Sequence, residues 1–230
     1  MLFNQRVVAL TPMKAHSERV PNKNIREFAG LPLFHHILDT LQETYAVDEI
    51  VVDTDSKHIA TEASKRFSKV RAIPRAEELR GDFVSMNDII AYDISRVDAD
   101  IYVQTHATNP LLSEKTISDA LRRFATSDQH DSLFAVTRIQ TRLYFADGRP
   151  INHDPKRLIR TQDLPPVYQE NSCLYIFTKN SFEGSGNRRI GRRPLLYETD
   201  RIESIDIDDE FSFGLAELLA RYSQKKGKMH

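Results

Sequence analysis

Three cationic side chains lie close together in a polar stretch near the N-terminus. Lys14, Arg19 and Lys23 fall within ten residues, directly after a short apolar run, and Ser17 and Asn24 lie beside them. Cations at this spacing could neutralise a polyphosphate, while hydroxyl, amide and backbone N–H groups could hold its oxygens. The glycine and lysine pattern of a Walker A loop is absent. The residues therefore indicate either a phosphate-binding loop of another kind or a solvated basic loop.

A pair of carboxylates lies near the other end of the chain. In the alternating segment 205–208, Asp206 and Asp208 would project from one face of a strand, because strand side chains alternate with a period of two. Like charges this close repel unless a cation lies between them, and Mg²⁺ prefers oxygen ligands, with phosphates and water completing its shell. The alternative is a solvent-facing strand that leads into a helix with an acidic first turn. The interpretations of one segment as a phosphate-binding loop and of the other as a pair of metal ligands strengthen each other, because the chemistry of nucleotides uses both.

Polar residues also occur where expected strands meet loops. Gln104 ends an apolar run and leads into a polar loop that contains His106, and Asn171 precedes another apolar run. Ligands are contacted from such positions, although a capped connection or a turn asparagine would look the same. His16 and His106 lie in the two candidate site loops, but neither histidine alone identifies a site.

Other reactive residue types carry less information. His35 and His36 are expected on a helix surface, because no cysteine or third histidine gives them metal-site spacing. Cys173 is expected to be a small buried residue that forms no Cys–His dyad.

The elements expected from apolar periodicity alternate between strand and helix over the first 140 residues. This alternation indicates right-handed βαβ units and a mostly parallel sheet, whose ligands lie beyond the carboxyl ends of the strands. The loops after Leu10, Thr54, Gln104 and Asp208 should therefore hold the site. Strands are expected at 7–10, 49–54, 72–74, 100–104, 133–139, 173–178 and 205–208. Helices are expected at 32–44, 56–67, 86–97, 114–126 and 209–223, the last with Phe211, Leu215, Leu218, Leu219 and Tyr222 on one stripe.

The segment 140–170 differs from the rest of the chain. It is rich in arginine, aspartate and proline and has no long apolar run. Structureless loops of this length are rare in compact domains. The segment is therefore either a disordered loop or an arm that packs on a second subunit.

Composition limits the class of protein. A chain of 230 residues suits a single domain, here spanning 1–230. The 32 lysines and arginines against 33 acidic residues give a net charge of -1, without the basic excess typical of nucleic-acid binding. No apolar run approaches the roughly 20 residues of a membrane span, and the N-terminal residues lack a signal-peptide pattern. With its single cysteine, the sequence predicts a soluble, cytoplasmic protein with no nucleic-acid or membrane partner.

These motifs together resemble the acylneuraminate cytidylyltransferases, the CMP-sialic acid synthetases and their relatives. In the first segment, Pro12, Ser17, Arg19, Pro21, Lys23 and Asn24 match the signature P-A-R-G-G-S-K-R-I-P-x-K-N. Five further segments resemble family motifs in family order, and together they cover residues 6 to about 220. These segments are 52–55, 74–82, 104–112, 170–175 and 205–211, the last matching I-D-I-D-x-E-x closely.

The resemblance implies an α/β, Rossmann-like nucleotidyltransferase fold with three layers and a mixed sheet. It implies a homodimer in which the arm 140–170 is swapped and reaches the partner's active site. It also implies an Mg²⁺-dependent reaction in which CTP and a nine-carbon keto sugar acid, similar to sialic acid, give the CMP-sugar and pyrophosphate. The anomeric oxygen of the sugar would attack the α-phosphorus in line.

The resemblance also implies roles for the matching residues. Lys14 replaces a family arginine and would contact the phosphates, and Lys23 would stabilise charge on the transition state and on the leaving pyrophosphate. Asp206 and Asp208 would carry Mg²⁺, so that Lys14, Lys23 and Asp208 become the expected catalytic residues. The residues expected to bind the nucleotide are Pro12, Lys14, Ser17, Arg19, Asn24, Arg75 and Asp82.

The sugar acid is expected to be held by two residues of the same chain and one arginine from the arm. Gln104 and Asn171 would bind the sugar. Arg157 or Arg160, supplied from the swapped arm, would meet its carboxylate, because a guanidinium fork suits that group.

Several positions depart from the family pattern. Ala15-His16 replaces two glycines, Glu18 replaces a lysine, Leu112 replaces an arginine, and Gln169 stands where well-known members carry a sugar-binding arginine. These changes affect the choice of sugar more than nucleotide transfer. The alternatives are a sugar-1-phosphate nucleotidylyltransferase, a glycosyltransferase, and a non-catalytic protein that binds a nucleotide or sugar acid.

Overall fold

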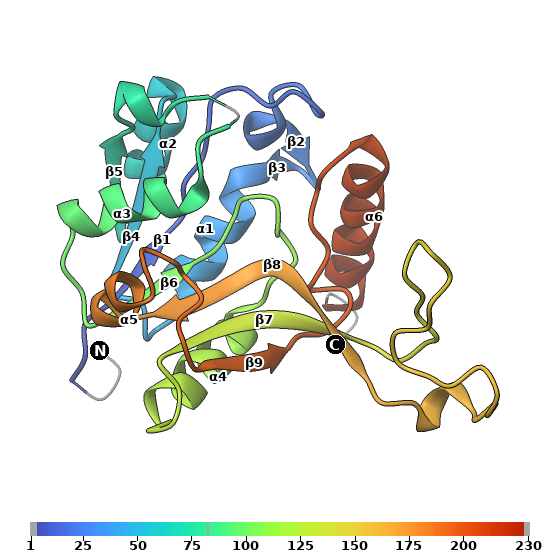
Figure 1. Ribbon diagram of the computed structural model, residues 1–230. Coiled ribbons are helices and arrows are strands. Elements are labelled where there is room, and N and C mark those ends of the chain that lie inside the picture. The colour runs from blue at the N-terminus through green and yellow to red at the C-terminus, as the bar shows by residue number, and fades with distance from the viewer. Residues whose placement is uncertain (1–3, 82, 228–230) are drawn as a thin grey trace.

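The computed structural model describes residues 4–81 and 83–227 and contains a seven-stranded sheet with the order β5-β4-β1-β6-β8-β7-β9 (Figure 1). Six of the seven strands run in one direction, and β8 alone runs antiparallel to its neighbours β6 and β7. The expected mixed sheet is therefore confirmed. The strands are β1 Val7–Leu10, β4 Glu49–Thr54, β5 Val70–Pro74, β6 Ile101–Gln104, β7 Ser132–Ile139, β8 Val167–Phe177 and β9 Pro194–Glu198.

The strand order reverses between β1 and β6. From β1 the chain adds β4 and β5 on one side and then returns to place β6 on the other. Leu10 and Gln104, the last residues of β1 and β6, are register partners. The loops that follow these two strands therefore leave the sheet side by side, at the type of position where α/β proteins bind ligands.

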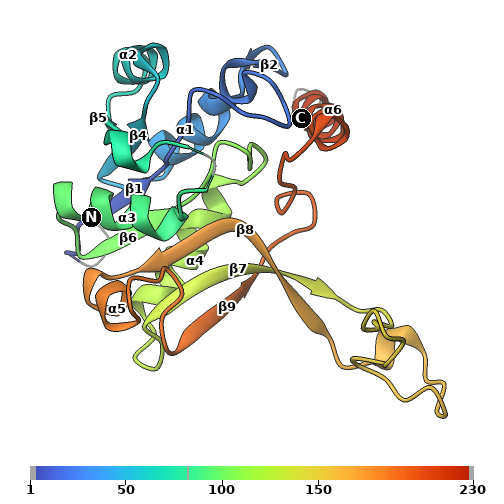
Figure 2. The same cartoon turned by 45° about the horizontal axis from the view of Figure 1, so that its top comes forward.

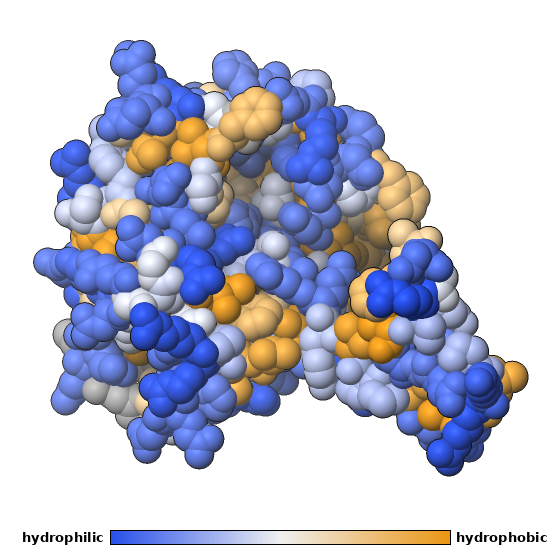
Figure 3. Space-filling view, viewed as in Figure 1, coloured by the Kyte–Doolittle hydropathy of each residue, from blue (hydrophilic) through white to orange (hydrophobic). Residues whose placement is uncertain are grey.

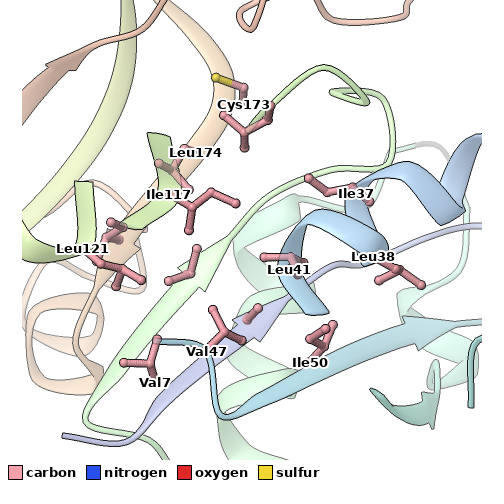
Figure 4. Packing of buried hydrophobic residues seen from close by; sticks show 14 of the residues in the cluster. Val7, Ile37, Leu38, Leu41, Val47, Ile50, Ile117, Leu121, Cys173 and Leu174 are labelled. Atoms are coloured by element: carbon pink, nitrogen blue, oxygen red, sulfur yellow. The ribbon is translucent and has the colours of Figure 1, made fainter. Parts of the chain in front are cut away.

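Helices cover both faces of the sheet, which gives the three expected layers. On one face, β1 packs against apolar residues of α1, α2 and α4, as Figure 4 shows for Val7, Ile37, Leu41 and Ile117. On the other face, Val8 and Leu10 belong to a cluster with side chains of α3 and α5. These helices are α1 Leu33–Glu43, α2 Lys57–Arg66, α3 Met86–Arg96, α4 Glu114–Ala125 and α5 Lys179–Gly184.

The last helix, α6 (Glu210–Gly227), packs beside a small hairpin of β2 (Glu27–Phe28) and β3 (Leu31–Pro32). Phe213 and Ala216 form its buried side with Phe28 of the hairpin. The apolar stripe noted in the sequence faces solvent instead. Its exposed members are Phe211, Leu215, Leu218 and Tyr222.

Two expectations about local structure are wrong. Residues 205–208 form no strand and instead run as an irregular segment into α6. Their apolar alternation has another cause: Ile207 is buried against α6, and its N–H donates to the Thr108 carbonyl at 2.9 Å. His35 does not lie on a helix surface, because its side chain is buried, with Nε2 2.8 Å from a Glu62 oxygen.

Residues between β7 and β8 form a projection that extends away from the body of the protein (Figure 2). A bridge between Tyr144 and Pro150 shapes one part of it, and the Gln140 amide donates to the carbonyls of Gln162 and Leu164 at 2.8 Å. The segment is thus a folded arm rather than a structureless loop. Leu158, 80% exposed, is one of several apolar side chains that the arm presents to solvent.

Within the described residues, no helix is both long enough and apolar enough to cross a bilayer.

Candidate functional site

A cavity of about 350 Å³ opens beyond the carboxyl ends of β1 and β6. Figure 3 shows the surface hollowed in this region, between the helices at the upper left and α6. Every described residue that the sequence assigned to nucleotide binding lines it, whereas Asp82 lies outside the described residues. The lining includes Pro12, Lys14, Ser17, Arg19, Lys23, Asn24, Arg75 and His106.

The cationic loop is held in place by hydrogen bonds rather than left free in solvent. The Met13 N–H donates to the Asp53 carbonyl at 2.8 Å, and the Ala15 N–H donates to Asp55 Oδ1 at 2.7 Å. The amide of Asn24 donates to the Lys14 carbonyl at 2.9 Å. Asn24 therefore shapes the loop, in addition to lining the cavity.

Lys23 ties this loop to the carboxylate segment. It is 8% exposed, and its ammonium group donates to the carbonyl of Ile207, which lies between the two aspartates. Burial lowers the pKa of Lys23, and the charges of Asp206 and Asp208 oppose that shift. The sequence-distant cations and carboxylates thus meet at one site, as expected.

Asp206 and Asp208 have different surroundings. Burial raises the pKa of Asp206, and its Oδ1 has no hydrogen-bond donor among the described residues. Asp208 is about half exposed and pairs with Arg19 at 2.8 Å. An unpartnered buried carboxylate oxygen beside a second carboxylate is a donor set that suits a hard cation. No group of three or more acidic, histidine or cysteine side chains is gathered there within residues 4–81 and 83–227, so phosphates and water would have to complete the shell.

Arg75 is anchored below the cavity by a buried carboxylate. Its Nε donates to Asp53, its Nη2 donates to the Asp53 carbonyl at 3.2 Å, and its side chain is 6% exposed. Asp93 of α3 is fully buried next to this pair. The sequence pointed to Arg75 and to the segment that contains Asp53, but not to the contact between them or to Asp93.

A second group lies at the end of β6. Gln104 is fully buried, its Oε1 accepts a hydrogen bond from Arg189 Nη1 at 2.8 Å, and its Nε2 lies 2.9 Å from His106 Nε2. The Arg189 guanidinium lies 3.8 Å from the centre of the Tyr175 ring. Sequence reasoning missed Arg189, because in the run NRRIGRR it looks like one solvated cation among several.

Asn171 is buried but already engaged. Its amide nitrogen donates to Thr199 Oγ1 at 2.7 Å, and its Oδ1 accepts from the Cys173 N–H at 3.3 Å. The neighbouring Ser172 has a φ of 61°, at an irregularity in the pairing of β7 with β8. Asn171 lines a shallow hollow together with Glu170, Asp206 and Asp208, and its expected contact with the sugar stays a prediction.

The two arm arginines lie apart from both hollows of their own chain. Arg160 pairs with Asp163 at 2.7 Å within the arm, and neither Arg157 nor Arg160 lines the cavity. Their expected role at a partner's site stays a prediction. Cys173 is free and buried, as expected.

Comparisons with known proteins identify relatives over most of the chain. A family model described as "Cytidylyltransferase" matches residues 8–220. CMP-N,N'-diacetyllegionaminic acid synthase of Legionella pneumophila is 28% identical, over 96% of this chain and 98% of the relative. Pseudaminic acid cytidylyltransferase of Campylobacter jejuni is 26% identical, over 86% of this chain and 93% of that protein. N-acylneuraminate cytidylyltransferase B of Danio rerio is 30% identical over 91% of this chain, which spans 50% of that protein.

Solved structures confirm the fold. A CMP:2-keto-3-deoxy-manno-octonic acid synthetase, solved in complex with CTP, superposes with a TM-score of 0.68 over 95% of this chain and 99% of its own, at 16% identity. The 4-diphosphocytidyl-2C-methyl-D-erythritol synthase of Anaerococcus prevotii superposes with a TM-score of 0.70 over 96% and 98%, at 12% identity. At such identities the likeness concerns the fold alone.

Proposed function

The chain belongs to the cytidylyltransferase family, and we propose that it transfers CMP from CTP to the anomeric hydroxyl of a nine-carbon keto sugar acid. Relatives named for legionaminic, pseudaminic and N-acylneuraminic acids, matched over most of this chain, support this class of acceptor. The observation that carries the proposal is the meeting of Lys14, Arg19 and Lys23 with a buried carboxylate at the point where the strand order reverses.

In the proposed reaction the anomeric oxygen forms a bond to the α-phosphorus. The bond from the α-phosphorus to the oxygen that bridges to the β-phosphate breaks, and pyrophosphate leaves with that electron pair. The hydroxyl proton passes to solvent. Negative charge grows on the phosphate oxygens during this step, and ammonium and guanidinium groups fixed beside them stabilise it. Lys14 and Arg19 would meet the triphosphate, and Lys23 would act at the leaving side.

Asp206 and Asp208 would hold Mg²⁺, which would supply Lewis-acid stabilisation of the phosphates. The buried, unpartnered Oδ1 of Asp206 supports this role. Binding would exchange the Arg19–Asp208 ion pair for an arginine–phosphate and a carboxylate–metal contact. That exchange is inexpensive, because exposed ion pairs contribute only about 0–1 kcal/mol.

We further propose a homodimer in which the arm of one subunit seats on α6 of the other. The arm and α6 each expose apolar side chains, including Leu158 on the arm and Phe211 and Leu218 on α6; Figure 3 shows apolar surface over both. Residues 141–166 of the arm carry five cations against three carboxylates. The start of α6 and the two residues before it, 208–217, carry four carboxylates and no cation, whereas the second half of α6 is basic, so a basic arm would seat on the first half of the helix. Since α6 begins two residues after Asp208, an arm seated on its first turns would lie next to the segment proposed to bind the metal.

We propose that this reaction takes place in the cytoplasm. A single cysteine that is free and buried is compatible with that compartment.

A pyrophosphate-release assay tests the proposal. The protein would be incubated with Mg²⁺, each of the four nucleoside triphosphates, and N-acetylneuraminate, pseudaminic acid, legionaminic acid or a sugar 1-phosphate. Release with CTP and one keto sugar acid is expected. Release with UTP and a sugar phosphate would instead identify a sugar-1-phosphate nucleotidylyltransferase. CTP binding without any release would identify a binding protein.

A further inference from the structure

Arg189 has a fixed position at the expected acceptor end of the site. It lies in the loop between α5 and β9, and its side chain is 19% exposed. Its guanidinium is held from two sides, by the hydrogen bond to Gln104 and by the face of the Tyr175 ring. Gln104 and Tyr175 are register partners on β6 and β8, so both supports belong to the rigid sheet.

The charge of Arg189 has little compensation. Its ion-pair partner among the described residues is Glu170, 3.9 Å from Nη2, and the Glu170 carboxylate also accepts a hydrogen bond from the Tyr175 hydroxyl. A separation of 3.9 Å is too long for a hydrogen bond. Burial also lowers the pKa of Arg189, although a guanidinium keeps its charge at neutral pH. A largely buried cation without a close counter-ion favours an incoming anion.

Gln104 connects this cation to the nucleotide cavity. Because a guanidinium can only donate, the Gln104 oxygen must face Arg189 and its amide nitrogen must face His106. His106 then accepts at Nε2 and carries its proton on Nδ1. Burial and the charges of Arg189 and Lys23 lower the pKa of His106 to about 3, so the ring is neutral. His106 itself lines the cavity. Two hydrogen bonds therefore separate the cavity wall from the Arg189 guanidinium.

We propose that Arg189 binds the carboxylate of the sugar acid within the same subunit, with Gln104 as the residue that positions its guanidinium. This inference rests on the proposed function. In the cyclic form of a 2-keto acid, the carboxylate and the attacking hydroxyl are attached to the same carbon. The cation that binds the carboxylate must therefore lie close to the α-phosphorus, at the border of the nucleotide cavity. Arg189 does not itself line the cavity, but Gln104 and His106 connect it to the cavity wall within one chain, whereas Arg157 and Arg160 lie in the arm.

The test compares Arg189→Gln with Arg192→Gln, which removes the same charge from an exposed position in the same loop. With saturating CTP, Arg189→Gln should raise the KM for the sugar acid by roughly 30-fold or more, because the buried carboxylate of the bound sugar loses its cationic partner. The KM for CTP should stay within about 2-fold of wild type in both variants. A KM for the sugar acid that is unchanged in Arg189→Gln would overturn the inference.

A binding measurement separates this inference from the proposed function. Calorimetry with N-acetylneuraminate and its C1 carboxamide, in the presence of CTP and without Mg²⁺, should show wild type preferring the acid and Arg189→Gln losing that preference. This result supports the role of Arg189 even where no pyrophosphate is released with any acceptor. Equal preference for the acid in wild type and variant refutes it. Turnover with a sugar 1-phosphate alone would overturn both the inference and the proposed function.

Discussion

Replacing Asp93 by asparagine should flatten the dependence of stability on pH. Asp53 and Asp93 are both fully buried, and Arg75 is the cation beside them. Both oxygens of Asp93 and Oδ2 of Asp53 lack a donor among the described residues, unless one carboxyl carries a proton. Burial, followed by repulsion from Asp53, raises the pKa of Asp93 to about 9. At neutral pH, Asp93 therefore keeps its proton and can donate it to Asp53.

The sign of the pH effect follows from proton counting. In the unfolded chain Asp93 loses its proton near pH 3.9, whereas in the folded protein it holds it to about pH 9. Between these values the folded state binds one more proton. The free energy of unfolding therefore falls by about 1.4 kcal/mol per pH unit, or about 3 kcal/mol from pH 6 to pH 8. The stabilisation is complete below about pH 4 and is lost as the pH rises toward 9.

Asparagine imitates the protonated acid, since its amide can donate to Asp53 and has no proton to lose. Urea unfolding followed by circular dichroism at pH 6, 7 and 8 measures the free energy of unfolding. Between pH 6 and pH 8 this free energy should rise by about 3 kcal/mol in Asp93→Asn relative to wild type. Asp88→Asn, on the exposed side of the same helix, controls for the replacement itself. A difference between Asp93→Asn and wild type that stays constant across the three pH values would refute the reasoning.

Three further outcomes are expected. Asp208→Asn should lower the rate of pyrophosphate release by roughly 100-fold or more and weaken the dependence of that rate on Mg²⁺, and near-normal turnover would contradict the metal role. Asp209→Asn should leave the rate unchanged, because asparagine can replace aspartate as the residue that caps α6. Chelation with EDTA should abolish release, and added Mg²⁺ should restore it. In sedimentation velocity, Leu218→Glu on α6 and Leu158→Glu on the arm should each weaken dimerisation by roughly 30-fold or more, whereas the control Tyr45→Glu, at an exposed residue just after α1, should not weaken it. Dimers that persist in both variants would exclude the proposed seating of the arm on α6.

The parts of the site that follow directly from a strand could be predicted from the sequence. Apolar runs locate β1 and β6, and parallel strands bring their carboxyl ends to one edge, so the loops after Leu10 and Gln104 had to be neighbours. The cations of the first loop gather in one cavity for this reason. Arg75 was found only through its family motif, and the buried aspartates that hold it lie on other elements.

The missed features depend on contacts between elements distant in sequence. Arg189 reaches Gln104 because the loop after α5 folds back over the end of β6, and no local pattern reports that path. Residues 205–208 imitate a strand because Ile207 packs against α6, which produces alternation without a sheet. The stripe on α6 has helical periodicity, but the core uses Phe213 and Ala216 of the same helix instead. Periodicity predicts that a face is apolar, and tertiary packing decides what covers it.

One part of the site is held rigidly by a buried lysine, and another part is an exposed ion pair whose partners can be exchanged when ligand binds. Lys23 is buried, and its bond to the Ile207 carbonyl holds the cationic loop against the carboxylate segment. Breaking that bond would leave a buried ammonium unpaired, which costs far more than an exposed pair contributes. Arg19 and Asp208 are more than half exposed, so their mutual contact can be exchanged for phosphate and metal at little cost. The near-zero net charge of the chain is therefore compatible with binding a triphosphate, because the cations and carboxylates that neutralise each other across this site are the groups that would bind the ligand.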